Sequence, residues 1–226
     1  LLVEPDPDRI LVIGLGGGTL PLAFADLLPQ ATIDVVEIDP AVVRVAERYF
    51  DFAATDRIRV HVRDGRVFTK RAGINAETYD LVILDAYNGD YIPEHMMTME
   101  FLQEVRDVLG ATGTVAANTF SISALYDHES ETYRAVFDRF FTLKYGYSTN
   151  RIIIASNATL PSRSTLQSRA RDWAEKLEAY EVPIEKYPQA LTLRVDWDQS
   201  KRPLTDQSAP ANLLRNRDGM RSTQPI

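Results

Sequence analysis

The chain has 226 residues, of which 45% are hydrophobic, and a formal net charge of −7 at pH 7. This length and composition can bury a full core, in one large domain or one domain with an appendage. The absence of cysteine excludes disulfides and thiolate metal sites. The histidines His61, His95 and His128 have no metal-ligand spacing, so we expect no metal. The negative charge argues against a nucleic-acid partner, whose phosphates require a basic face.

Strand-like apolar runs alternate with helix-like patterns along the chain, which predicts a doubly wound α/β fold with a mostly parallel sheet. The expected strands cover residues 9–14, 32–38, 57–62, 79–85, 114–118 and 151–155. The expected helices cover residues 19–28, 40–50, 66–72, 98–109, 128–140 and 164–180. Pro40 suits the first position of its helix, and Gly110 is expected to close the helix over 98–109.

The first expected strand ends in a glycine-rich turn at residues 14–19, with the sequence Gly-Leu-Gly-Gly-Gly-Thr. Glycine lets the chain turn tightly and lets a ligand approach the backbone closely. The dinucleotide fingerprint requires glycine at the first, third and sixth positions of this turn, and Thr19 occupies the sixth. The alternate glycines Gly14, Gly16 and Gly18 instead resemble the first motif of S-adenosylmethionine-dependent transferases.

Acidic residues follow the ends of the next three strands. Glu37 and Asp39 follow the second strand, Asp64 and Gly65 the third, and Asp85 the fourth. Ligands of open α/β sheets bind beyond the carboxyl ends of the strands, so we expect these residues to share one crevice. Two acids after the second strand suit hydrogen bonds to the two hydroxyls of a ribose. The sequence therefore predicts a nucleoside site.

The stretch 72–105 contains seven acids but no lysine or arginine. A rim of one charge sign is expected to attract a cationic substrate and to repel an anionic one. Within this stretch, His95 fits either a base beside the crevice or a structural hydrogen bond. Tyr87 fits either a substrate-stacking role or a simple cover over the pocket.

The order and spacing of these motifs resemble the spermidine synthase (polyamine aminopropyltransferase) family. The motifs concerned are Gly14–Gly18, Glu37–Asp39, Asp64-Gly65 and Tyr79–Asp85. Segments 92–102 and 203–210 look like a divergent bacterial branch, in which this domain can be fused to a membrane part. The resemblance implies a class I S-adenosylmethionine-dependent methyltransferase-like (Rossmann-like) domain.

The resemblance also implies a reaction, in which decarboxylated S-adenosylmethionine gives its aminopropyl group to a polyamine such as putrescine. Glu37 would hold the ribose hydroxyls and Asp64 the adenine amino group. A carboxylate must accept the proton of the attacking amine, whose pKa is near 10. Asp85 matches the first acid of the family's loop, and Asn88 replaces the second, the implied proton acceptor. The catalytic candidates are therefore Asp85, Asn88 and Asp90, of which Asp85 or Asp90 would handle the amine. The donor-binding candidates are Gly14, Gly16, Gly18, Glu37, Asp39, Asp64, Gly65 and Asp85.

Two other functions fit the same residues. Gly17 stands where the family usually has an aspartate for the donor's amine, and this change suits a methyltransferase that uses intact S-adenosylmethionine. The loss of an acid at Asn88 suits a non-catalytic module that binds the nucleoside or a polyamine. The form of the donor distinguishes the first two functions, and the absence of turnover would identify the third.

We expect residues 1–200 to form the nucleoside-binding transferase domain and residues 201–226 to form a C-terminal extension or tail. Leu1 lies almost directly before the first strand, so we expect an upstream region, either a β domain or a membrane part. The family resemblance implies a homodimer. An intracellular donor implies a cytoplasmic location, or the cytoplasmic face of a membrane.

Overall fold

The computed structural model describes residues 1–87, 91–144 and 148–208. The strands are β1 (Arg9–Ile13), β2 (Thr32–Glu37), β3 (Ile58–Val62), β4 (Tyr79–Leu84), β5 (Leu109–Phe120), β6 (Phe140–Leu143) and β7 (Asn150–Ser156). The α-helices are α1 (Thr19–Leu27), α2 (Pro40–Tyr49), α3 (Gly65–Ile74), α4 (Met99–Val108), α5 (Tyr126–Phe137), α6 (Arg163–Glu178) and α7 (Tyr187–Ala190). Two short 3₁₀ turns are η1 (Glu94–Met96) and η2 (Ile184–Lys186).

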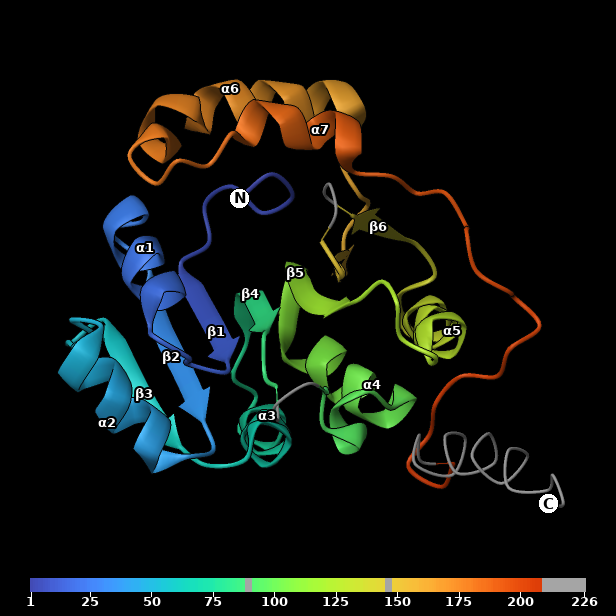
Figure 1. The fold of residues 1–226 in the computed structure, drawn as a ribbon, viewed down its shortest axis with the longest axis horizontal. Coiled ribbons are helices and arrows are strands. Elements are labelled where there is room, and N and C mark those ends of the chain that lie inside the picture. The colour runs from blue at the N-terminus through green and yellow to red at the C-terminus, as the bar shows by residue number, and fades with distance from the viewer. Residues whose placement is uncertain (88–90, 145–147, 209–226) are drawn as a thin grey trace, which may run out of the picture.

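The strands form one seven-stranded sheet in the order β3-β2-β1-β4-β5-β7-β6 (Figure 1). The first five strands in that order pair in parallel, whereas β7 pairs antiparallel with both β5 and β6. From β1 the chain adds β2 and β3 on one side of the sheet and then continues with β4 on the other side. The switch point, where doubly wound sheets bind ligands, therefore lies between β1 and β4. The predicted mostly parallel, doubly wound fold is confirmed.

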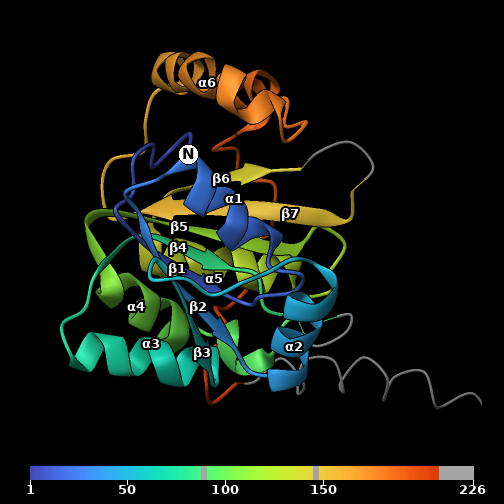
Figure 2. The ribbon, with the colours of Figure 1, turned by 90° about the vertical axis from the view of Figure 1, so that its left-hand side faces the viewer.

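Apolar side chains on both faces of the sheet explain why its central strands read as continuous hydrophobic runs. Along β1, Leu11 and Ile13 belong to one core, whereas Ile10 and Val12 belong to the other, because successive side chains point to opposite faces. The first core packs against α3, α4 and α5, and the second packs against α1, α2 and α6. Figure 2 shows the sheet between α6 on one side and the α3–α4 pair on the other.

Side-chain caps begin four of the helices. The capping side chains of Asp39, Asp64, Thr98 and Ser162 each accept a backbone N–H from the first turn of α2, α3, α4 and α6, respectively. Such caps satisfy amide groups that have no partner within the helix. Pro40 occupies the first turn of α2, as predicted. Two of these caps, Asp39 and Asp64, are also candidate site residues.

The expected end of the helix before β5 was wrong. The helix α4 ends at Val108, and Gly110 lies inside β5 rather than closing the helix. The strand β5 begins at once because Leu109 pairs with Tyr79, ahead of an irregularity in the β4–β5 register. A Cβ at Gly113 would lie 2.8 Å from the Tyr79 carbonyl oxygen, so the strands approach closely there.

The sequence patterns also missed β6. The helix expected over 128–140 instead spans Tyr126–Phe137 and ends at Asp138, whose φ of 62° leaves the helical region. Phe140 then begins the short edge strand β6, which pairs with β7. Its sequence, Phe-Phe-Thr-Leu, does not alternate between apolar and polar residues, so the strand depends on β7 as its template.

The segment after α7 runs past α5 toward the carboxyl ends of the parallel strands (Figure 1). Leu204 is 1% exposed and packs with Met97 and Leu125, so the segment after residue 200 is anchored to the core at this residue. The division of the chain at residue 200 stays a prediction. No helix within the described residues is long and apolar enough to cross a membrane.

Candidate functional site

The glycine turn, β2 and β4 meet at one point of the sheet edge. Gly14 donates its backbone N–H to the Val36 carbonyl at 2.8 Å, and Asp85 donates its own to the Ile13 carbonyl at 2.9 Å. Gly14 has a φ of +102°, and a Cβ on it would lie 2.3 Å from the Asp85 carbonyl oxygen. The backbone of the turn therefore contacts the backbone at the end of β4, and only glycine fits at position 14.

Alanine at Gly14 and at Gly16 is expected to have different consequences. Both residues have positive φ, but a Cβ at Gly16 meets nothing within 4 Å. Gly16→Ala is expected to cost about 1 kcal/mol of unfolding free energy from backbone strain alone. Gly14→Ala adds a clash with backbone, so we expect a loss of about 3 kcal/mol. Urea denaturation of both variants tests this difference, and equal losses would contradict the close-packing explanation.

Glu37, the candidate ribose ligand, is held by the backbone around it. Its Oε2 accepts the Leu15 N–H at 3.0 Å, and its Oε1 accepts the Asp39 N–H at 2.9 Å. Each carboxylate oxygen has a further lone pair that can accept a hydroxyl. Asp39 caps α2 by accepting the Ala41 N–H at 2.7 Å through Oδ1. The structure thus gives Asp39 a helix-capping role, and ligand binding by Asp39 stays a prediction.

Asp64, the candidate adenine ligand, lies at the start of α3. Its Oδ1 accepts the Val67 N–H at 2.9 Å, and its Oδ2 lies 3.1 Å from Nε2 of His95. Gly65 is required by packing, because a Cβ there would lie 2.4 Å from Cγ2 of Ile13. His95 therefore makes a hydrogen bond to a candidate donor-binding residue, which is one of the two roles that the sequence left open, and a role as base stays a prediction.

Asp85, the candidate proton acceptor, follows β4 directly. Its Oδ1 accepts the Asn118 side-chain amide at 3.0 Å, and the Asn118 oxygen accepts the Asn150 amide at 2.9 Å. This relay from β5 and β7 fixes the orientation of the carboxylate. The other two catalytic candidates, Asn88 and Asp90, lie outside the described residues, so their part in catalysis stays a prediction.

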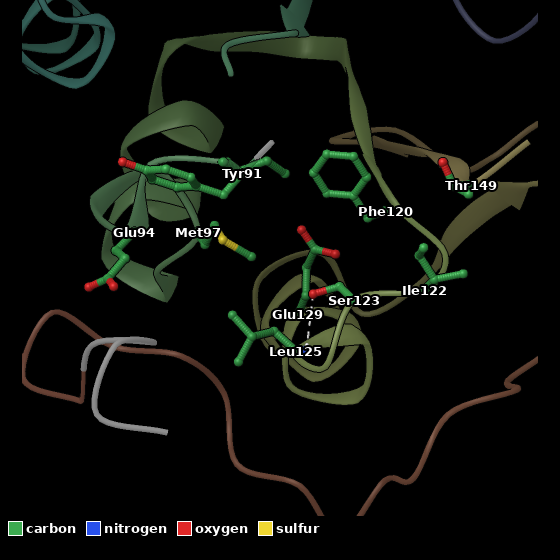
Figure 3. Close-up of a pocket in the computed structure, with 10 residues that line it drawn as sticks. Tyr91, Glu94, Met97, Phe120, Ile122, Ser123, Leu125, Glu129 and Thr149 are labelled. Atoms are coloured by element: carbon green, nitrogen blue, oxygen red, sulfur yellow. Dashed lines mark hydrogen bonds between the residues drawn. The ribbon is translucent and has the colours of Figure 1, made fainter. Parts of the chain in front are cut away.

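A cavity of about 460 Å³ opens beyond the carboxyl end of β5 (Figure 3). Its walls are mostly apolar and aromatic, with two carboxylates. Its lining includes Tyr91, Glu94, Met97, Phe120, Leu125 and Glu129. An apolar cavity with a few placed polar groups is the usual form of a small-molecule site.

Glu129 enters this cavity from α5 and is paired from behind. Its Oε2 lies 2.5 Å from Nη2 of Arg151, a residue that is 0% exposed. The Arg151 guanidinium also donates to the Thr119 and Ser130 hydroxyls and lies 4.0 Å from the ring centre of Tyr126. Burial raises the pKa of the Glu129 carboxyl, and the charge of Arg151 opposes this shift.

Tyr87 connects Asp85 to the cavity. Its ring contacts Phe120 edge-on, with 5.3 Å between the ring centres. Burial raises the pKa of the Tyr87 hydroxyl, and the nearby carboxylates of Asp85 and Glu129 raise it further. Among the described residues, no group makes a hydrogen bond to this buried hydroxyl. A buried orphan hydroxyl is expected to gain a partner from a bound ligand.

The acid-rich stretch does not form the single rim that we expected. Asp80 accepts backbone N–H groups of Asp8 and Arg9 at the opposite end of β4. Glu77 lies 3.6 Å from Arg9, and Glu104 is paired with Arg66. These acids are neighbours in the sequence. In the structure, Asp80 lies at the opposite end of β4 from Asp85, and Glu77 and Glu104 are paired with arginines.

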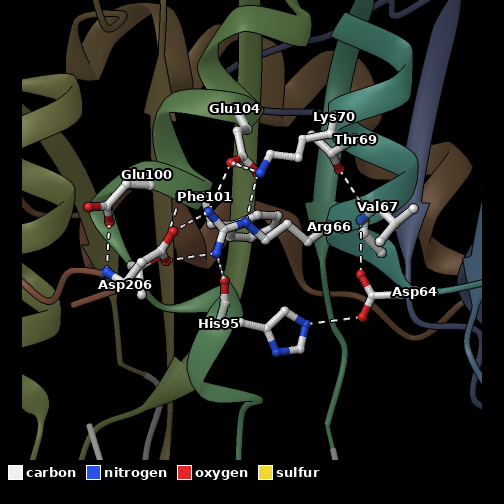
Figure 4. Close-up of polar contacts among 12 residues, drawn as sticks. Asp64, Arg66, Val67, Thr69, Lys70, His95, Glu100, Phe101, Glu104 and Asp206 are labelled. Atoms are coloured by element: carbon white, nitrogen blue, oxygen red, sulfur yellow. Dashed lines mark hydrogen bonds and ion pairs between the residues drawn. The ribbon is translucent and has the colours of Figure 1, made fainter. Parts of the chain in front are cut away.

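Arg66 links three parts of the chain beside Asp64 (Figure 4). Its guanidinium contacts Glu104 on α4, the His95 carbonyl on η1 and Asp206 in the C-terminal segment. Hydrogen bonds from Arg66 lower the pKa of Asp206, and Asp206 in turn raises the pKa of Arg66. The structure thus places Asp206 beside Arg66, next to the candidate adenine ligand.

Sequence reasoning missed Asn118, Glu129 and Arg66 as site residues. Asn118 and Glu129 lie more than 30 residues beyond Asp85, in elements without a recognisable motif. Arg66 belongs to the Asp64-Gly65-Arg66 run, and its place directly after this motif was the available signal. Among the described residues, no group of three or more His, Asp or Glu side chains could hold a metal ion.

Acids after β2 and β3, a glycine turn at the switch point and a mostly parallel sheet define a class I S-adenosylmethionine-dependent methyltransferase-like fold. A family model described as the spermine/spermidine synthase domain matches residues 1–169. A polyamine aminopropyltransferase of Vibrio vulnificus (strain CMCP6) is 51% identical over 216 residues, which cover 95% of this chain and 72% of that protein. The chain belongs to the spermine/spermidine synthase family.

Two kinds of solved structure resemble this fold, a methyltransferase-like protein and a spermidine synthase. Human methyltransferase-like protein 13 in complex with SAH has a TM-score of 0.72 at 28% identity, and the match covers 78% of this chain and 85% of that one. A spermidine synthase in complex with the transition-state analogue AdoDATO has a TM-score of 0.60 at 23% identity. That match covers 75% of this chain and 61% of the spermidine synthase.

Proposed function

We propose that this protein transfers an aminopropyl group from decarboxylated S-adenosylmethionine to a polyamine such as putrescine. The observation that carries the proposal is the cavity lined by Glu94 and Glu129, which Tyr87 connects to Asp85. An alkylammonium group is a donor without acceptors, so its partners must be oxygen acceptors. The cavity lining includes these two acids, and the Tyr87 hydroxyl, which has no hydrogen-bond partner among the described residues, lies near enough to Glu129 for that carboxylate to raise its pKa.

The donor fits the other half of the crevice. Glu37 has lone pairs for the ribose hydroxyls, and Asp64 has them for the adenine amino group. Ile38, between two acids at the end of β2, is 64% exposed, which gives a flat base an apolar surface to cover. The open space around a Cβ at Gly16 leaves room for a ligand against the turn.

The chemistry requires a deprotonated amine in line with a carbon–sulfur bond. The amine nitrogen attacks the aminopropyl carbon next to the sulfonium, and the bond from that carbon to sulfur breaks. The electron pair of that bond remains on sulfur, which gives neutral methylthioadenosine. The proton leaves the amine for a carboxylate, for which Asp85 is the described candidate. Holding both reactants in this geometry supplies much of the rate enhancement.

Methyl transfer from intact S-adenosylmethionine is the second candidate function. The observation in its favour is the likeness to human methyltransferase-like protein 13, which was solved with SAH. The two carboxylates of the cavity favour a cationic acceptor in either reaction, so the acceptor alone does not separate them. The form of the donor does.

The first experiment is calorimetric binding of S-adenosylmethionine, its decarboxylated form and methylthioadenosine, followed by a mass-spectrometric assay with putrescine. We expect the decarboxylated donor to bind more tightly and to release methylthioadenosine together with spermidine. Preference for the intact donor with methylated products would replace aminopropyl transfer by methyl transfer. Tight binding of the nucleosides without any product would identify a non-catalytic binding module.

A further inference from the structure

The Arg66 guanidinium is saturated with hydrogen bonds. Its Nε and Nη2 donate to the two oxygens of Glu104 at 2.8 and 2.9 Å, and its Nη1 and Nη2 donate to the two oxygens of Asp206 at 2.7 Å each. The remaining bond goes from Nη1 to the His95 carbonyl at 3.0 Å. These contacts use all five N–H donors of an arginine, and two of the pairings are bidentate. Such a group fixes its partners in direction as well as in distance.

Asp206 brings the C-terminal segment into this cluster from 140 residues away. Its Oδ1 also accepts the Thr98 hydroxyl at 2.8 Å, and its backbone N–H donates to Glu100 at 3.0 Å. Two residues earlier, the Leu204 carbonyl accepts the Met99 N–H at 2.8 Å. The segment 204–206 is therefore fastened to the start of α4, directly after the turn that carries His95.

His95 connects the Arg66 cluster to Asp64, the candidate adenine ligand. Its carbonyl is held by Arg66, and its imidazole Nε2 lies 3.1 Å from Oδ2 of Asp64 (Figure 4). Oδ1 of Asp64 is fixed by the Val67 N–H at the start of α3. With one bond on each oxygen, the carboxylate cannot rotate without losing a hydrogen bond, yet each oxygen retains a lone pair.

We propose that His95 is a positioning residue for the nucleoside donor: it orients the Asp64 carboxylate toward the adenine amino group, and the Arg66–Asp206 pair holds His95 in place. This inference rests on the proposed function, because it takes Asp64 as the adenine ligand. It adds a residue of η1 and a residue of the C-terminal segment to the machinery that recognises the base. Neither touches the reacting atoms.

The test compares two nucleosides that differ at the amino group. Methylthioadenosine carries this group, and methylthioinosine has a carbonyl oxygen instead. We expect His95→Ala to weaken methylthioadenosine binding about tenfold, because the Asp64 carboxylate is then no longer oriented for its hydrogen bond with the adenine amino group. Binding of methylthioinosine should change by less than about twofold, because it has no amino group to donate to Asp64. Calorimetry on the full chain gives both constants.

A conservative variant separates positioning from a merely structural role. The amide nitrogen of glutamine reaches about as far as Nε2 of histidine and can donate to Asp64, so His95→Gln should restore most of the lost affinity. Asp206→Asn should reproduce part of the loss by weakening the bidentate pair with Arg66. The matched control is Asp198→Asn, an exposed acid earlier in the same segment that pairs with Lys201, and it should change neither constant.

Equal weakening of both nucleosides by His95→Ala, or no weakening, would overturn the inference while leaving the transferase proposal intact. Failure of His95→Gln to restore methylthioadenosine binding would also overturn it. A wild-type protein that binds methylthioadenosine with the expected dependence on His95, but forms no aminopropyl product, would support the inference and contradict the proposed transfer. Absence of nucleoside binding by the wild-type protein would overturn both.

Discussion

Asp85→Asn is expected to lower kcat for aminopropyl transfer by about 10²–10⁴-fold, the usual contribution of a general base. The Asp85 carboxylate follows β4 and is oriented by Asn118, so it is the described group best placed to accept the amine proton. An amide has nearly the same shape, but it cannot accept a proton near neutral pH. The affinity for methylthioadenosine should remain within about twofold, because this nucleoside lacks the aminopropyl group, which is the part of the donor that meets the attacking amine.

The measurement is kcat with saturating donor and putrescine, together with the binding constant for methylthioadenosine. Asp107→Asn is the matched control, because Asp107 is an exposed acid on α4 and undergoes the same chemical change. That control should retain wild-type kcat. A kcat of Asp85→Asn within tenfold of the wild-type value would transfer the role of base to another group, with Asp90 the first to test.

Glu129→Leu is expected to lower the free energy of unfolding by about 3–5 kcal/mol. The reason is that Arg151 is fully buried, and Glu129 is its partner of opposite charge at 2.5 Å. Removing the carboxylate leaves a buried cation that arginine cannot relieve by losing its proton. Denaturant unfolding at neutral pH, with a check that the slope is unchanged, measures the loss.

A double variant provides the control for this prediction. In Glu129→Leu/Arg151→Met both charges are absent, so the protein should be more stable than the single variant and should recover most of the loss. Replacing a buried ion pair by packed apolar side chains is often close to neutral. A single variant that loses less than about 1 kcal/mol would show that water or another group compensates the Arg151 charge.

The two variants also separate stability from acceptor binding. The stabilised double variant still lacks the Glu129 carboxylate in the cavity, so its KM for putrescine should be higher than that of the wild-type protein. If Glu129 contributes only to folding, the double variant should have a wild-type KM.

Much of the fold could be predicted because its signals are local. The apolar runs of β1 and β4, Pro40 at the start of α2 and the glycine turn depend on neighbouring residues, and the structure confirms the elements that they predicted. The structure also places Glu37, Asp64 and Asp85 at or just after the carboxyl ends of β2, β3 and β4, and their part in ligand binding stays a prediction. Strand ends of a parallel sheet meet at one edge, so the order of elements suffices to bring these residues together.

The errors arose where a neighbouring element decides the outcome. Gly110 reads as a helix stop, but pairing of Leu109 with Tyr79 draws the chain into β5 directly after Val108. The strand β6, which begins at Phe140, has only four residues and forms because β7 supplies its hydrogen bonds. The secondary-structure propensity of a few consecutive residues contains no information about such partner strands.

The sequence by itself determined the doubly wound sheet, the glycine turn and the placement of Glu37, Asp64 and Asp85 at the ends of β2, β3 and β4. Each of these depends on spacing along the chain or on the rule that parallel strand ends share an edge. Only the tertiary structure brought Glu129 together with Arg151, and Arg66 together with Asp206. These pairs join residues 22 and 140 positions apart in the chain, and no local pattern specifies which charges meet when the layers pack.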